Sequence, residues 1–201
     1  MNGDTGRRPL GLVACGALVR NVIELTRRRG WDADVHGIAA THHLRPARIA
    51  EAVEAKLAEL DGRYDRVVVV YGDCGTVGAL DRVLARHGAV RPEGPHCYEM
   101  YAGDDFGPLV AERDGGTYVL TDWLVRNWER AVVRSLGLDR RPSLSGAYFG
   151  GFRRVLHLRQ APDPALDDKA RGIAASLGLP LETRDTGLGD LERRLVSLVE
   201  G

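Results

Sequence analysis

Short apolar runs alternate with longer segments of helical periodicity along most of this chain, and this alternation limits the fold more than any other feature. The clearest run is residues 67–71, four valines and a tyrosine, of the kind that parallel sheets bury on both faces. Residues 10–14 and 33–39 are similar runs, each followed by apolar residues at helical spacing. This order predicts an α/β fold with a mostly parallel, doubly wound sheet and helices on both faces.

The pattern changes between residues 98 and 150. Residues 118–136 are expected to form a long helix, and we interpret residues 98–150 as a helical insertion or lid. A weak fourth strand is expected near residues 89–91, before this segment. The chain is therefore predicted to be a single α/β domain over residues 1–201. Beyond the insertion, strands are expected at residues 152–158 and 181–184, and helices at residues 164–177 and 191–199.

The charge balance removes several classes of partner. The chain has 28 basic and 28 acidic residues and a formal net charge of zero, so there is no bulk attraction to nucleic acid or to an anionic membrane. No run approaches the roughly 18 apolar residues of a membrane helix. The first apolar stretch is soon interrupted by Arg20 and Asn21, unlike a secretory signal. We therefore expect a cytoplasmic protein that acts on a small-molecule ligand.

The three cysteines occupy equivalent positions in the predicted fold. Cys15, Cys74 and Cys97 each lie where an apolar run ends in a glycine or a turn. Ligands of open α/β sheets collect beyond the carboxyl ends of the strands. A thiol at the start of the next helix is also favoured as a thiolate by the helix dipole. The sequence therefore predicts that three thiolates meet at one edge of the sheet and act as metal ligands.

Two kinds of metal centre are compatible with three cysteine thiolates. Zinc in catalytic sites has three protein ligands and one open position. An iron–sulfur cubane held by three cysteines would leave one iron for a substrate or another ligand. The cysteines come from separate loops and form no Cys-x-x-Cys pair, which argues against a structural zinc ribbon.

Two histidines are candidates for the same edge. His43 follows the second strand, and His96 directly precedes Cys97. Either side chain would serve as a proton donor or as the fourth metal ligand. Both are expected to be catalytic residues if the protein is an enzyme.

A glycine-rich loop follows the clearest strand. Gly72, Gly75 and Gly78 recur at intervals of three, and such a loop either cradles an anion or lets the chain turn with Cys74 held forward. It lacks the lysine of a phosphate-binding P-loop. Thr121 or Asp122, further along, is expected to cap a helix. The residues predicted to contact a cofactor are Gly16, Tyr71, Gly72, Asp73 and Gly75.

Five short motifs stand out together: Ala-Cys-Gly-Ala-Leu at residues 14–18, His43 with Pro46, Tyr-Gly-x-Cys-Gly at residues 71–75, His-Cys at residues 96–97, and Gly-Thr-Tyr-x-Leu-Thr-x-Trp at residues 116–123. They resemble the family called domain of unknown function 1638, and the resemblance covers most of the chain, ending near the strand at residues 152–158. That family is typified by its cysteines, which supports Cys15, Cys74 and Cys97 as a unit. Some members are encoded near corrinoid-dependent methyl-transfer proteins, which implies a corrinoid or methyl-transfer protein as a partner. Tyr98 and Glu99 depart from the apolar run of many members.

Three functions follow from these residues. The first is a metal-binding protein whose three cysteines hold one zinc ion or iron–sulfur cluster with an open coordination position, acting on a small sulfur- or methyl-bearing molecule. The second is an accessory protein that binds a cofactor or a partner protein without catalysis. The third is a metal-free thiol enzyme with one nucleophilic cysteine.

Overall fold

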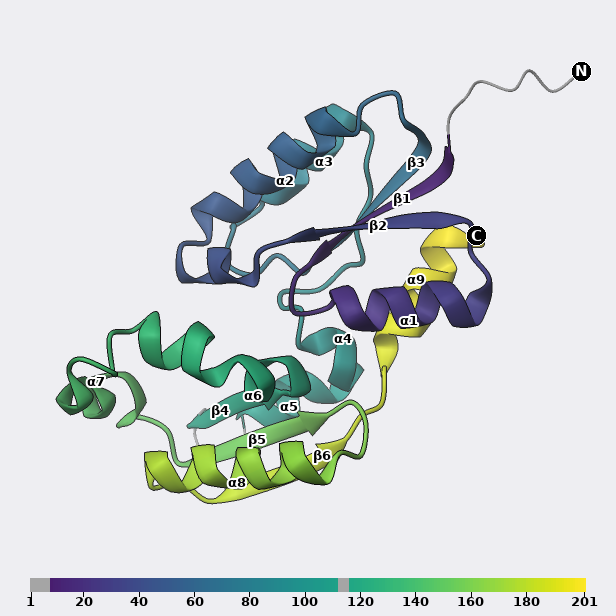
Figure 1. The fold of residues 1–201 in the computed structure, drawn as a ribbon. Coiled ribbons are helices and arrows are strands. Elements are labelled where there is room, and N and C mark those ends of the chain that lie inside the picture. Colours follow the sequence, from purple (N-terminus) through teal and green to yellow (C-terminus); the bar gives the residue numbers. More distant parts are fainter. Residues whose placement is uncertain (1–7, 112–115) are drawn as a thin grey trace, which may run out of the picture. The chain divides into compact units, whose positions relative to one another are not determined.

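The computed structural model describes residues 8–111 and 116–201 (Figure 1). Contacts divide the chain into two compact units, residues 1–100 with 191–201, and residues 101–190. Each unit contains a three-stranded parallel sheet, with strand orders β2-β1-β3 and β4-β5-β6. The mostly parallel α/β class is therefore confirmed, with the described strands divided between two sheets. A single domain with an insertion was expected, and the second unit lies in the sequence between the two segments of the first.

The first unit places its helices on both faces of its sheet. In Figure 1, α2 and α3 lie on one face, and α1 and α9 lie on the other. Val68, Val69 and Val70 are fully buried, as expected of a strand covered on both sides. The elements of this unit are β1 (Arg8–Cys15), α1 (Val19–Arg29), β2 (Ala33–Ile38), a 3₁₀ turn (Ala40–Leu44), α2 (Ala47–Glu59), β3 (Tyr64–Val70), α3 (Ala79–His87), α4 (Glu99–Ala102), which continues into the second unit, and α9 (Asp190–Val199).

The predicted fourth strand is reduced to a single bridge. Val68 and Val90 form an isolated parallel bridge, in which the Val69 amide donates to the Val90 carbonyl at 2.8 Å. Proline at positions 92 and 95 removes two backbone donors directly beyond this point, so no ladder can continue there. The segment still runs along β3 and leads to Cys97.

The second unit begins within residues 98–150, the segment interpreted as a helical insertion or lid. Residues 117–121 form a strand that pairs with β5, so this segment is not wholly helical and contributes to a second sheet. The predicted helix over residues 118–136 starts only at Asp122, because Thr121 is the N-cap and its Oγ1 accepts from the Leu124 amide at 3.3 Å. The elements are α5 (Phe106–Ala111), β4 (Thr117–Thr121), α6 (Asp122–Trp128), a π-helical turn (Glu129–Arg134), α7 (Ser145–Phe149), β5 (Arg154–Arg159), α8 (Pro164–Leu177) and β6 (Leu181–Asp185).

The second unit has its own apolar core. Leu120 and Val155 from the sheet pack in one cluster with Trp128 of α6 and Ile173 of α8. Asp163 caps α8 by accepting hydrogen bonds from the amides of residues 165 and 166. A second set of buried apolar contacts, independent of the first sheet, thus stabilises residues 101–190.

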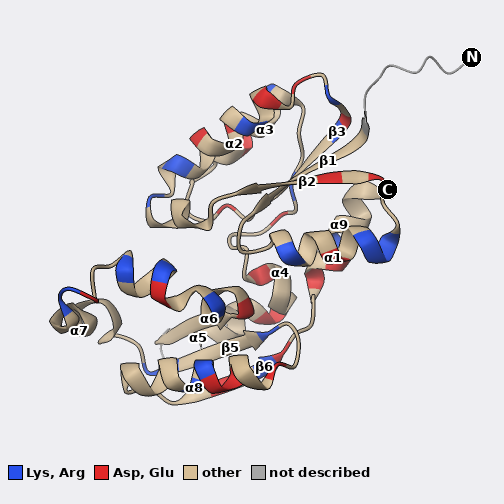
Figure 2. Ribbon diagram, in the orientation of Figure 1, with Lys and Arg blue, Asp and Glu red and all other residues tan. Residues whose placement is uncertain are grey.

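Acidic and basic residues are interspersed along the helices of each unit, as on α1 and α8 in Figure 2. This mixing agrees with the net charge of zero. Among the described residues, no helix has the length and apolar character needed to cross a bilayer.

Candidate metal centre

The first two site segments are held together at the ends of β1 and β2. Cys15 is the last residue of β1 and lies opposite Ile38 at the end of β2. The Gly16 amide donates to the Ile38 carbonyl at 2.7 Å. A Cβ at position 16 would lie 3.0 Å from that carbonyl oxygen and 3.1 Å from the Ala40 nitrogen. Glycine at position 16 therefore allows the turn that carries His43 to pack beside Cys15.

The loop after β3 is built around the Asp73 carboxylate. It accepts hydrogen bonds from the Thr76 hydroxyl at 2.7 Å and from the amides of Val77 and Gly78 at 3.1 and 3.0 Å. Burial opposes the charge, but these hydrogen bonds hold the pKa of Asp73 below its ordinary value. Asp73 thus positions its own loop, and it was predicted to contact a cofactor. Thr76 was missed, although the Asp-x-x-Thr spacing is a recognisable turn signal.

Cys74 has an unusual backbone in this loop. Its φ is 49°, in the left-handed region that residues other than glycine rarely adopt. Its neighbour Gly75 has φ 84° and lies close to Pro46, which follows the His43 turn. Strained backbone of this kind persists where the surrounding structure fixes it, and it clusters at functional sites. The loop therefore presents Cys74 in a defined direction.

Cys97 reaches the site because its chain approaches Gly72 closely. A Cβ on Gly72 would lie 2.6 Å from the His96 carbonyl carbon, which no other residue type tolerates. The amides of Asp73 and Cys74 donate to the carbonyls of Gly94 and Pro95 at 2.9 and 2.7 Å. The Gly72 amide also points to the Cys97 sulfur at 3.5 Å. The glycine pattern therefore serves the packing of two loops.

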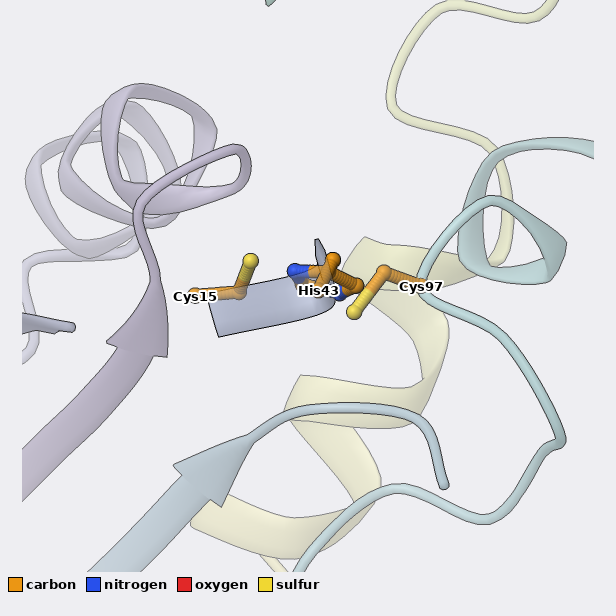
Figure 3. A group of neighbouring side chains, drawn as sticks. All are labelled: Cys15, His43 and Cys97. Atoms are coloured by element: carbon orange, nitrogen blue, oxygen red, sulfur yellow. The ribbon is translucent and has the colours of Figure 1, made fainter. Parts of the chain in front are cut away.

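These segments bring the cysteines and one histidine together. The ligand atoms of Cys15, His43 and Cys97 all lie within 4.8 Å of one another (Figure 3). The Cys74 sulfur lies 3.3 Å from the Cys97 sulfur. All three cysteines are free and buried, whereas His43 is exposed. A Cys-His-Cys group with a third thiol beside it could hold a metal ion.

Hydrogen bonding divides the protons unequally among the thiols. Hydrogen bonding with Cys97, together with nearby histidine, lowers the pKa of Cys74 to about 3 and that of Cys15 to about 7. Those same two hydrogen bonds and complete burial raise the pKa of Cys97. In the metal-free protein the cysteines therefore already carry negative charge at neutral pH, which suits a cation.

The histidines carry the compensating charge. Desolvation by the surrounding protein lowers the pKa of His43. The hydrogen bond of His43 to Cys74 and the charges of Cys15 and Cys74 outweigh this effect and raise the pKa to about 9. A hydrogen bond to Cys74 also raises the pKa of His96, which is exposed. The His43 Nδ1 lies 2.8 Å from the Ala40 carbonyl oxygen and must donate to it, so Nε2 is the nitrogen available to a metal.

Tyr71 packs against His43 at the site. Its side chain is fully buried and stacks on His43 with ring centroids 6.0 Å apart. Among the described residues, its hydroxyl has no hydrogen-bond partner of normal geometry. Burial and the neighbouring thiolates raise the pKa of Tyr71 well above its ordinary value, so the hydroxyl keeps its proton. It is a donor that lies beside the Cys15 thiol.

The donor atoms lie close enough together for one metal ion to contact several of them. Four ligands at about 2.3 Å from zinc lie about 3.8 Å apart, and three thiolates with one imidazole are a known zinc set. The observed 3.3 Å between two sulfurs and the 4.8 Å limit for the Cys-His-Cys group bracket this separation. Cys74 and His96 both lie outside the group of three ligand atoms; Cys74 is joined to it by its 3.3 Å contact with Cys97, and His96 contacts Cys74.

Fold and site together define a parallel α/β protein with a thiolate-rich candidate metal centre at the carboxyl edge of its first sheet. A family model described as "Protein of unknown function (DUF1638)" matches residues 38–195. The chain belongs to this family. The matched segment contains His43, Cys74 and Cys97 and extends beyond the predicted limit of the resemblance, whereas Cys15 precedes it. No curated protein and no solved structure matches the chain.

Proposed function

We propose that this protein binds one zinc ion through the thiolates of Cys15, Cys74 and Cys97 and the Nε2 atom of His43. The observation that carries the proposal is the convergence of these side chains from four separate segments, the end of β1, the turn after β2, the loop after β3 and the segment before α4. Soft thiolates with one imidazole favour zinc among the common divalent metals. Zinc binding replaces protons on Cys97 and His43, so the affinity rises with pH.

The separations favour a single ion over an iron–sulfur cluster. A cubane places several iron and sulfide atoms between its cysteines, so their sulfurs lie further apart than around one ion. Here two sulfurs lie 3.3 Å apart, and the third lies within 4.8 Å of Cys97. This compactness supports a mononuclear centre.

The surroundings support a small sulfur-bearing molecule as the substrate. Zinc supplies a binding point for soft sulfur ligands and polarises groups bound to it. Two apolar side chains in the site segments are exposed, Leu44 next to His43 in the sequence and Val77 in the Cys74 loop. Val77 is 84% exposed and has φ 51°, a rare conformation for a β-branched residue. Exposed apolar side chains on these segments suit a thiol or thioether with a small hydrocarbon group.

Metal analysis of anaerobically purified full-length protein tests the proposal. We expect about one zinc ion per chain and no acid-labile sulfide. The matched variants are His43→Ala and His42→Ala, since His42 lies next to the site residue but outside the group of ligand atoms. Loss of about tenfold or more in zinc affinity for His43→Ala and for each Cys→Ser variant, with His42→Ala unchanged, would support the ligand set. Absence of metal above trace amounts would overturn it, and iron with sulfide would establish the cluster instead.

A metal-free thiol enzyme is the second candidate, and the backbone of Cys74 favours it. Cys74 has a strained conformation and contacts both His43 and His96, as a nucleophile beside a base would. This candidate predicts rapid alkylation of Cys74 alone by iodoacetamide, in protein that contains no metal as purified. Equal and slow alkylation of all three cysteines would exclude it.

A further inference from the structure

The sulfurs of Cys74 and Cys97 are nearly in position for a covalent bond. They lie 3.3 Å apart, and a disulfide requires about 2.05 Å, so a small rotation of both side chains would close the distance. The two loops are tied by backbone hydrogen bonds from residues 73 and 74 to the carbonyls of Gly94 and Pro95. The pair is therefore held together without a metal.

We propose that Cys74 and Cys97 form a reversible disulfide on exposure to a hydroperoxide, and that this oxidation ejects the metal ion. The second half of this inference rests on the proposed zinc site. Two of the four ligands are consumed when the bond forms, and the remaining cysteine and histidine are too few for a stable zinc site. Oxidation would thus switch off metal binding.

The surroundings select this pair among the three thiols. Cys74 is the least buried, at 7% exposure, and lies on a loop, whereas Cys15 is fully buried at the end of β1. A small hydroperoxide therefore meets Cys74 first. The Cys97 sulfur lies 3.3 Å from the Cys74 sulfur, and it acts as the resolving cysteine.

The reaction balances with the hydroperoxide as the sole oxidant. The Cys74 thiolate attacks one peroxide oxygen, the O–O bond breaks, and an alcohol leaves after taking one proton, with sulfenic acid formed on Cys74. The Cys97 thiol then loses its proton as its sulfur attacks the Cys74 sulfur, the S–S bond forms, the S–O bond breaks, and hydroxide leaves as water with that proton. One thiolate, one thiol, one hydroperoxide and one proton give one disulfide, one alcohol and one water.

Peptide mapping of the full-length protein tests the inference, with hydrogen peroxide as the probe. Arg20, Arg66 and Arg82 cut the chain so that trypsin places each cysteine on its own peptide. Zinc-loaded and metal-free samples are oxidised, digested without reduction, and analysed by mass spectrometry, while a chromogenic chelator records zinc release. We expect one cross-link between the Cys74 and Cys97 peptides, a fall from three free thiols to one, and one zinc released per disulfide, all reversed by dithiothreitol.

The variants separate the two proposals. Cys15→Ser should keep the cross-link, and Cys74→Ser and Cys97→Ser should each abolish it. A dominant cross-link to Cys15, or sulfinic acid on Cys74 without a cross-link, would overturn the inference. A Cys74–Cys97 link in a chain that never binds metal would support the oxidation site and overturn only the zinc site. Zinc binding without any cross-link would support the zinc site and overturn the oxidation site.

Discussion

The candidate centre depends on individual residues whose small size allows neighbouring loop segments to pack backbone against backbone. Gly72 leaves no room for a Cβ against the His96 carbonyl carbon, and Gly16 has almost none against Ile38 and Ala40. Asp73 then fixes the loop by accepting two amides and one hydroxyl. These contacts position the backbone around the cysteines through Gly16, Gly72 and Asp73, three of the residues expected to bind a cofactor.

Replacing Gly72 with alanine should disrupt the site. The new Cβ would lie 2.6 Å from backbone, so the loop with Cys97 must move, at an expected loss of about 1–3 kcal/mol in the free energy of unfolding. The control is Gly172→Ala within α8, where a Cβ meets no atom within 4 Å and should stabilise by about 0.5–1 kcal/mol. Urea denaturation and zinc titration measure both. Unchanged zinc affinity in Gly72→Ala would show that the close approach is unimportant.

Tyr71→Phe separates stability from metal affinity. Because the buried hydroxyl has no partner of normal geometry, its removal should leave the metal-free protein equally stable or more stable. If the hydroxyl donates to a metal-bound thiolate, zinc affinity should fall by about tenfold, as for other groups that orient metal ligands. Denaturation of the metal-free variant and competition for zinc with a chelator give the two values. Lower stability with normal affinity would assign Tyr71 to packing alone.

Among elements, the junction of β4 and α6 is the least expected feature. The strand passes into the helix without an intervening loop, with Thr121 as N-cap and Asp122 as the first helical residue. The Asp122 carboxylate is buried and lies 3.0 Å from His157 Nε2 in β5, and it also accepts the Ala161 amide at 3.2 Å. This pair ties the start of α6 to the end of the neighbouring strand.

A double-mutant cycle measures that link. Asp122→Ala and His157→Leu should each lower the free energy of unfolding by about 1–3 kcal/mol, because each leaves a buried polar group without its partner. The double variant should lose less than the sum, since no unpaired partner remains. Strict additivity in thermal or urea unfolding would mean that the two side chains do not interact.

At the scale of the whole molecule, the two sheets have separate cores, and the candidate centre belongs entirely to the first unit. A ligand stabilises the state that binds it. Removing zinc should therefore lower the stability of the first unit and leave the stability of the second unit unchanged.

Hydrogen exchange followed by mass spectrometry tests this separation. Chelation should speed exchange in residues 71–78 and 93–97, whose loops carry the ligands, and leave β4, β5 and β6 unchanged. The Cys74→Ser variant should exchange at the faster rate with or without a chelator. Uniform acceleration across both units would show that the chain unfolds as one cooperative body.

Local pattern was sufficient for the fold class and for most elements. The valine run of β3 and the helical stripes of α1, α2 and α8 are visible because burial on both faces, or on one stripe, leaves a fixed spacing of apolar residues. It was insufficient at residues 118–136, where a strand leads directly into a capped helix and the combined apolar spacing resembles that of one long helix. It also did not reveal that the strands divide between two sheets. Strand partners are chosen by long-range pairing, which spacing along the chain does not encode.

The same division applies to the site. The sequence alone determined that Cys15, Cys74 and Cys97 follow strand ends, because apolar runs and glycines mark those ends directly. Only the tertiary structure decided that His43 joins Cys15 and Cys97, that Cys74 lies 3.3 Å from Cys97, and that Asp73 serves its own loop. Those distances depend on how loops from separate strands pack against each other, and it is the close backbone contacts at Gly16 and Gly72 that fix them.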